Sequence, residues 1–202
     1  MKINLVFDGN SLLSENNLFM PTGQTAYTWV NTVANILRYD HTVRCTNFAV
    51  AGQNIQAMIA RGGLSDAAYD APSDINILVA WEGTNQLFTT SPRASIALLS
   101  GYCKAKQTRG FKVLNGTVIS RREAGSPADF ETRRSRYNDE LLRTYETFSD
   151  GCIDYGDPTT TFGSYNAPLD LLRFPDLTHF SPFGSGAAIV KTVDGIKRLL
   201  TR

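Results

Sequence analysis

The sequence is short of histidine and cysteine, the two residue types that most often hold transition metals. Its 202 residues include two histidines and three cysteines, and the cysteines, Cys45, Cys103 and Cys152, lie far apart along the chain. Such spacing matches neither a zinc site nor a disulfide framework, and two histidines exclude a His-rich metal centre. We predict no metal site and expect small buried thiols.

Excess charge and long apolar runs are missing as well. Lys and Arg together number 20 against 19 for Asp and Glu, a formal charge of +1, which gives no long-range field to attract nucleic acid or an anionic membrane. No run approaches the ~18 apolar residues that span a bilayer, and the first apolar run is too short for a signal peptide. We therefore expect a small-molecule substrate of little charge, no nucleic-acid partner, no membrane insertion, and a location in the cytoplasm or in a larger particle.

Short apolar segments alternate with segments of helical periodicity. The expected strands are residues 3–7, 42–50, 75–81, 111–119 and 152–155, with Gly116 a weak point in the fourth. The expected helices are residues 24–38, 53–61, 92–109, 129–148 and 182–202, and residues 156–178 are irregular. Alternation of this kind implies crossover connections, hence a largely parallel sheet with helices on both faces. We predict one α/β domain, residues 1–202, around five strands.

Polar residues follow the expected strands at the edge where such sheets bind ligands, beyond the carboxyl ends of the strands. They occur in four blocks: FDGNSLL with Ser11, NFAVAGQNI with Gly52, WEGTNQL with Asn85, and DLTHFSP with Asp176 and His179. The topology alone places these blocks along one edge of the sheet.

Together these residues supply what acyl transfer requires. A serine hydroxyl is a weak nucleophile without an adjacent base, and His179 is a candidate base that Asp176 is suited to orient. The backbone N–H groups of Ser11 and Gly52 and the side-chain amide of Asn85 are candidate donors to an oxyanion. Taken singly, Ser11 fits a helix cap or turn, Gly52 a permissive backbone position, and Asn85 a loop amide. Their joint occurrence favours the catalytic interpretation.

Other polar groups have simpler interpretations. We expect His41, after Asp40 at a helix end, to have a structural role. The arginines of two clusters are expected on solvated faces rather than in a phosphate site: Arg121 and Arg122, and Arg133, Arg134 and Arg136.

The four blocks resemble the SGNH hydrolases, also called the GDSL esterase family, whose four namesake residues match Ser11, Gly52, Asn85 and His179 in order. The resemblance spans residues 7–182. It implies a three-layer α/β/α sandwich related to flavodoxin, and hydrolysis of esters or thioesters without a metal or organic cofactor. It also implies that Ser11 is the nucleophile, His179 the base and Asp176 its orienting partner, with Ser11, Gly52 and Asn85 forming the oxyanion hole.

The sequence departs from the family pattern at two positions. Asn10 stands where the Gly-Asp-Ser-Leu motif has aspartate, and Gln86 stands where a second aspartate follows Asn85. Neither replaced residue performs the chemical step, so the departures bear on loop geometry, rate and preference, and they leave the site less anionic.

The expected substrate is a small acyl ester, with O-acetyl groups on carbohydrate as the leading candidate. Aromatic residues near the base suit sugar faces or, alternatively, pack the loop itself: Tyr155, Phe162, Tyr165 and Phe174. Two alternatives stay open. One is a lipid or thioester hydrolase of the same family, and the other is an inactive carbohydrate- or surface-binding module, for instance in a viral fibre.

Overall fold

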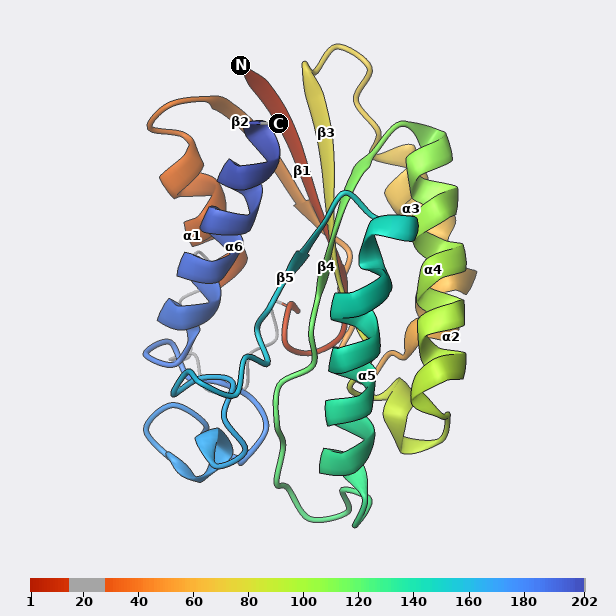
Figure 1. The fold of residues 1–202 in the computed structure, drawn as a ribbon. Coiled ribbons are helices and arrows are strands. Elements are labelled where there is room, and N and C mark those ends of the chain that lie inside the picture. The colour runs from red at the N-terminus through yellow and green to blue at the C-terminus, as the bar shows by residue number, and fades with distance from the viewer. Residues whose placement is uncertain (15–27, 202) are drawn as a thin grey trace.

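A five-stranded parallel sheet runs through the centre of the molecule (Figure 1). The computed structural model describes residues 1–14 and 28–201. Its strands are β1 (Lys2–Gly9), β2 (Thr42–Asn47), β3 (Ile75–Trp81), β4 (Lys112–Gly116) and β5 (Gly151–Ile153). Their order is β2-β1-β3-β4-β5 and every neighbouring pair is parallel, which is the flavodoxin-like order. The predicted parallel α/β sheet is confirmed.

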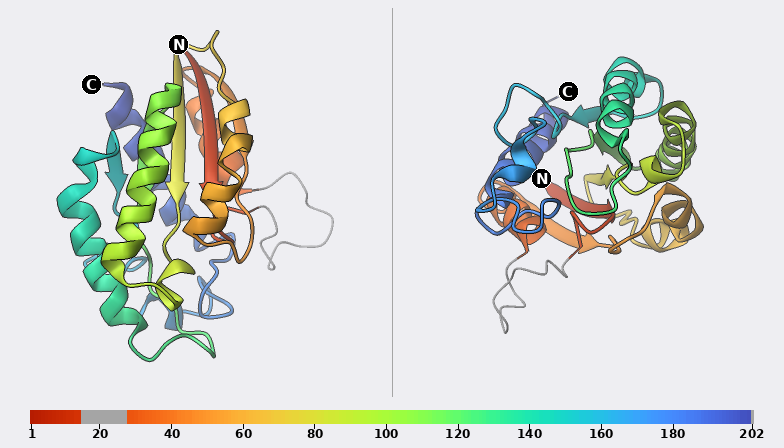
Figure 2. Two further views of the ribbon diagram at one scale, coloured as in Figure 1. Left: turned by 90° about the vertical axis from the view of Figure 1, so that its right-hand side faces the viewer. Right: turned by 90° about the horizontal axis from the view of Figure 1, so that it is seen from below.

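Helices cover both faces of the sheet, as Figures 1 and 2 show. On one face lie α1 (Trp29–Leu37) and α6 (Ser185–Leu200); on the other lie α2 (Ile55–Ala60), α3 (Gly62–Ala67), α4 (Pro92–Arg109) and α5 (Phe130–Thr144). Three short 3-10 turns are η1 (Gln86–Phe88), η2 (Tyr145–Thr147) and η3 (Ala167–Leu169). The three-layer α/β/α sandwich is therefore confirmed. Within the described ranges, no helix combines the length and apolar character needed to cross a membrane.

Local sequence explains where the longest helix begins and ends. Ser91 caps α4 by accepting a hydrogen bond from the Ala94 N–H, and Pro92 occupies the first turn, where its missing N–H costs nothing. Gly110 ends the helix in the left-handed conformation, with φ 108°. This helix starts near the carboxyl end of β3 and returns the chain to the amino end of the parallel strand β4.

Several boundaries differ from the sequence prediction. The fourth strand ends at Gly116 instead of residue 119, because the Val118 N–H bonds the side chain of Asn138 on α5 instead of a neighbouring strand. The last helix begins at Ser185 and not at Pro182, because residues 182–184 form a turn in which Ser181 Oγ accepts the Gly184 N–H. The predicted helix 53–61 is followed by a second short helix, α3. Of the predicted helix 24–38, residues 24–27 lie outside the described residues.

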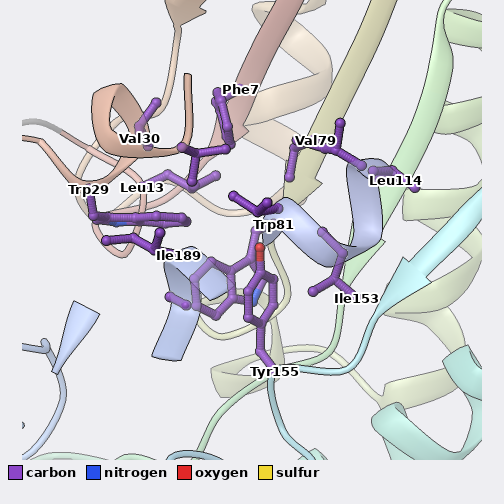
Figure 3. Close-up of a cluster of buried hydrophobic side chains, with 14 of the residues drawn as sticks. Phe7, Leu13, Trp29, Val30, Val79, Trp81, Leu114, Ile153, Tyr155 and Ile189 are labelled. Carbon is purple, nitrogen blue, oxygen red and sulfur yellow. The ribbon is translucent and has the colours of Figure 1, made fainter. Parts of the chain in front are cut away.

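A cluster of buried hydrophobic side chains, several of them aromatic, lies between the sheet and the α1–α6 layer (Figure 3). Trp81 stacks on Tyr155 with ring centroids 3.8 Å apart. Phe180 stacks on Trp81 at 6.2 Å and meets Trp29 edge-on at 5.9 Å. Gly116 lies beside this stack, where a Cβ atom would come within 2.6 Å of both Trp81 and Tyr155. These rings thus join β3, α1, the segment directly after β5 and the segment that precedes α6.

The aromatic residues of segment 155–178 mostly belong to this core. Tyr155, Phe162 and Phe174 are buried, and only Tyr165 of the four is exposed. Of the two interpretations of these rings, packing of the loop itself holds for the three buried ones, because they pack a segment that has little regular secondary structure. Packing around Phe180 fixes the position of its neighbour, His179.

We expect Phe180→Ala to lower the free energy of unfolding by about 3–5 kcal/mol, as for other buried phenylalanines, because the cavity cannot collapse against two tryptophans. Urea unfolding measures the change. Phe183→Ala is the matched control, because Phe183 is exposed and its loss should change stability by no more than about 0.5 kcal/mol. Equal effects of the two substitutions would contradict this account of the core.

Candidate active site

Ser11 lies in a tight turn directly after β1. The carbonyl oxygen of Asn10 accepts the N–H groups of Leu13 and Ser14, which closes the turn. Two side chains from other elements hold it from outside: the Trp29 indole donates to the Leu12 carbonyl at 2.8 Å, and Asn47 Nδ2 donates to the Leu13 carbonyl at 2.6 Å. The serine is thus presented, partly exposed, at the carboxyl end of β1.

Ser11, His179 and Asp176 form a continuous hydrogen-bonded chain. His179 Nε2 lies 2.7 Å from Ser11 Oγ, and His179 Nδ1 lies 2.7 Å from Asp176 Oδ2. Burial opposes ionisation of Asp176, but hydrogen bonds from the His179 ring and from the N–H groups of His179 and Thr178 outweigh it and lower the pKa of this carboxyl. A carboxylate held ionised in this way favours the tautomer with the proton on Nδ1, which leaves Nε2 free to accept the serine proton.

The turn between Asp176 and His179 has an unusual backbone. Leu177 has a positive φ of 66°, which a residue with a branched side chain adopts only under constraint. Its carbonyl oxygen accepts the Arg122 N–H at 2.8 Å, a bond that ties the turn to the segment after β4. This conformation lets Asp176 bond both the backbone and the ring of a residue three positions away.

Gly52 and Asn85 lie in the loops after β2 and β3, at the same edge. Gly52 has a positive φ of 75°, a backbone conformation that residues with side chains rarely adopt. A Cβ atom there would meet nothing within 4 Å, so glycine is favoured by the backbone conformation and not by a lack of space. Asn85 Nδ2 donates to the Gln53 carbonyl at 2.7 Å, which leaves its second hydrogen free. No acceptor for the N–H of Ser11 or Gly52 occurs among residues 1–14 and 28–201.

Arg121 belongs to this site, and its interpretation as part of a solvated face is wrong. Its side chain is 11% exposed and lies over the Phe88 ring, where it pairs with Glu123 and donates to Asn85 Oδ1 at 3.2 Å. Burial lowers the pKa of Arg121 to about 10 against the opposing effect of the Asp176 and Glu82 carboxyls, so the guanidinium stays charged at neutral pH. Its hydrogen bond to Oδ1 thereby fixes the orientation of the Asn85 side-chain amide, with Nδ2 on the other side.

Arg134 is also buried, in contrast to the sequence expectation. It pairs with Glu131 one turn away and donates to the Val118 carbonyl. Within the second arginine cluster Arg136 is exposed as expected, and Arg133 is half-buried. The amphipathic pattern of α5 did not predict the burial of Arg134, because the loop after β4 covers that side of the helix.

Two buried carboxyl groups beneath the site were missed by the sequence interpretation. Asp8, the next-to-last residue of β1, accepts the Tyr102 hydroxyl at 2.6 Å and Gln53 Nε2 at 3.3 Å, and burial raises its pKa. Glu82, directly after β3, accepts the Gly83 N–H at 2.8 Å. Burial raises the pKa of Glu82 to about 8, although interactions with the Asn10 side chain and the Asn85 N–H favour the ionised form. Glu82 is therefore mostly protonated at neutral pH.

These carboxyls give a physical reason for Asn10. Its side chain is buried, accepts the Leu12 N–H at 3.0 Å and interacts with Glu82. An aspartate at this position would add a third buried carboxyl beside Asp8 and Glu82, with a correspondingly high cost of desolvation and repulsion. The amide keeps the turn and avoids that charge.

Gln86, the second departure, is buried in η1 and donates to Thr90 Oγ1 at 2.6 Å. Its amide supports the loop that carries Asn85.

The cysteines and His41 lie outside this constellation. Cys103 is buried, whereas Cys45 and Cys152 are half-buried, so the expectation of buried thiols holds fully for one of the three. His41 is half-buried in the connection between α1 and β2. In the part of the chain that the structure describes, no group of three or more His, Cys, Asp or Glu side chains is placed to hold a metal ion.

Known structures share this fold across nearly the whole chain. A member of the lipolytic protein G-D-S-L family from Veillonella parvula has a TM-score of 0.74 and 17% identity, covering 97% of this chain and 99% of that one. The esterase EstA from Pseudoalteromonas sp. has a TM-score of 0.73 and 12% identity, covering 98% and 99%. The acetylxylan esterase Axe2 from Geobacillus stearothermophilus has a TM-score of 0.68 and 16% identity, covering 95% and 92%.

The chain therefore has the fold of the GDSL-type lipolytic proteins and esterases. At these identities the likeness concerns the fold. Neither a protein-family model nor a curated protein sequence matches the chain.

The raised pKa of Glu82 predicts a pH-dependent stability. Between its ordinary value of 4.5 and about 8, the folded protein keeps a proton that the unfolded chain releases, so the free energy of unfolding falls as pH rises through this window and levels off above it. Glu82→Gln removes the ionisable group and should be progressively more stable than the wild type toward pH 8.

Chemical denaturation at pH 5 and pH 8.5 measures this difference. Glu146→Gln on the exposed η2 turn is the control and should leave the pH dependence of the wild type unchanged. Identical pH dependence in the wild type and Glu82→Gln would refute a buried, protonated Glu82.

Proposed function

We propose that this chain is a serine esterase that hydrolyses small acyl esters, and that its substrates are O-acetyl groups on carbohydrate. The observation that carries the proposal is the hydrogen-bonded chain from Ser11 Oγ through both ring nitrogens of His179 to Asp176, with 2.7 Å at each step. This is the arrangement by which a base activates a serine and a carboxylate orients the base.

The reaction begins at Ser11. Its oxygen attacks the ester carbonyl carbon while His179 Nε2 takes the hydroxyl proton, and the carbonyl oxygen becomes an oxyanion. The imidazolium, stabilised by ionised Asp176, then gives the proton to the departing alcohol as the C–O bond breaks, leaving an acyl-serine. Water attacks this acyl group with His179 again as base, and the acid product leaves as Ser11 regains its proton.

The oxyanion would be stabilised by the N–H groups of Ser11 and Gly52 and by the free hydrogen of Asn85 Nδ2. These donors come from three loops at one sheet edge, and two of them lie in backbone that is fixed before substrate arrives. The Gln53 carbonyl and the Arg121 guanidinium hold the Asn85 amide from opposite ends. Such preorganisation is usually the largest single contribution to catalysis of this type.

The choice of an O-acetyl carbohydrate is supported by the similarity in fold to the acetylxylan esterase. It receives less support from aromatic residues than the sequence suggested, because only Tyr165 of those four is exposed. The alternative of an inactive binding module rested on Asn10 and Gln86. Both side chains are buried and hydrogen-bonded within their loops. Neither disturbs the hydrogen bonds that link Ser11, His179 and Asp176.

Ser11→Ala should reduce kcat/KM for a chromogenic acetyl ester by at least about 1000-fold, because the nucleophile is lost while the fold is kept. A fluorophosphonate probe should label the wild type at Ser11, as peptide mass mapping can show. Ser135→Ala, on the exposed side of α5, is the control and should retain activity and labelling. Equal turnover by Ser11→Ala and wild type, or labelling at another residue, would sink the proposal.

Asn85→Ala should lower kcat by about 100- to 1000-fold with a smaller change in KM, because the amide acts on the oxyanion and not on the ground-state ester. Steady-state kinetics on the same acetyl ester measures the split, with the exposed Asn166→Ala as control. An effect on KM alone would contradict the proposed role of Asn85 in the oxyanion hole.

A further inference from the structure

A small cavity lies beside the loops of the candidate active site. Its volume is about 230 Å³, and its walls come from the segment after β4, the start of α5 and Tyr165. Figure 1 shows these segments at the same end of the sheet: the loop after β4 in green and the loop before α6 in light blue. Pockets for drug-sized ligands hold roughly 300–1000 Å³, so this cavity suits one small group and not a long acyl chain.

Two residues of the cavity wall contact the loops that carry the candidate active-site residues. Arg121, on its rim, donates to Asn85 Oδ1 at 3.2 Å. The Arg122 N–H bonds the carbonyl of Leu177, which lies between Asp176 and His179 in the sequence. The cavity is thus linked to the candidate active site through Arg121 and Arg122.

Most charges that line the cavity are compensated. Glu123 pairs with Arg121. Glu131 pairs with Arg134 and accepts the Ser120 hydroxyl at 2.6 Å. Each of these carboxylates thus has a guanidinium of its own.

Arg122 is the exception. Its guanidinium carbon lies over the Tyr165 ring, 3.7 Å from the centroid, and the guanidinium forms no ion pair with any carboxylate of residues 1–14 and 28–201. Its Nε is buried without a hydrogen-bond partner among these residues, as is the hydroxyl oxygen of Ser126 in the same cavity. Two buried polar groups without partners in one cavity are costly unless a ligand pairs with them.

We propose that this cavity is a subsite for a carboxylate carried by the ester substrate, held by Arg122 with Ser126 as a second hydrogen-bonding group. A planar guanidinium can bind a carboxylate through two parallel hydrogen bonds, and the contact with the Tyr165 ring restricts the movement of the Arg122 side chain. The inference rests on the proposed esterase function and narrows it to esters that bear one negative charge, in either the alcohol or the acyl half.

Two matched pairs of esters test whether the carboxylate belongs to the alcohol half or to the acyl half of the substrate. For the alcohol half, an O-acetylated galacturonic acid is compared with the same O-acetylated galactose, which has a hydroxymethyl group in place of the carboxylate. For the acyl half, mono-4-nitrophenyl succinate is compared with its neutral methyl ester. The readout is the ratio of kcat/KM for the charged and neutral members of each pair.

In the wild type this ratio should be about 10 to 100 for the half that enters the cavity. Arg122→Gln should bring it close to one, and Arg122→Lys should give an intermediate value, because lysine keeps the charge without the planar fork. The control is Arg109→Gln: Arg109 is exposed and stacks on Tyr69 at the end of α4, so its loss should leave the ratio unchanged. A wild-type ratio of one or less for both pairs, or an unchanged ratio in Arg122→Gln, would overturn the inference.

Binding measurements separate this inference from the proposed function. Calorimetry with galacturonate, succinate and galactose is done on Ser11→Ala with and without Arg122→Gln. Carboxylate binding that depends on Arg122, without turnover of any ester, would support the subsite and reject the esterase. Turnover that depends on Ser11, with ratios indifferent to Arg122, would reject the subsite alone.

Discussion

The packing of Phe180 against Trp29 and Trp81 is the interaction on which the rest of the site depends. Segment 156–182 has little regular secondary structure, so its position is set by the rings that it buries. Phe180 brings it onto the central strands, and His179 is thereby held 2.7 Å from a serine 168 positions earlier in the sequence. The distance is maintained by hydrophobic burial, and the hydrogen bonds then select the orientation of the ring.

Beneath the candidate active site lies a layer of buried polar side chains that carries little net charge. Asp8 and Glu82 lie at the carboxyl ends of the adjacent strands β1 and β3, and both are buried, which raises the pKa of each. Asn10 supplies the hydrogen bonds of an aspartate without a third charge. Arg121 adds one positive charge above the layer, next to the groups that would face the oxyanion. The site is thus built from neutral donors close to the serine and compensated charges farther away.

The sequence was sufficient to predict the parallel sheet, because buried strands are apolar throughout and helices have a different period. It also predicted that Ser11, Asp176 and His179 would meet, since residues that follow parallel strands share an edge. It failed for Arg121 and Arg122, because an arginine is exposed in most proteins and no pattern within the chain reveals the loop that covers these two. It failed for Glu82 for the same reason: a polar residue after a strand reads as a turn until its neighbours are known.

The order of the residues along the chain has a consequence for synthesis on the ribosome. Helix α1 packs against α6, so one whole face of the sheet combines an early helix with a late one. A nascent chain that has already displayed Ser11 lacks both His179 and this cover until nearly all of the described residues have emerged. We therefore expect the Ser11 hydroxyl to lack its proposed base during translation and to gain it only in the completed tertiary structure.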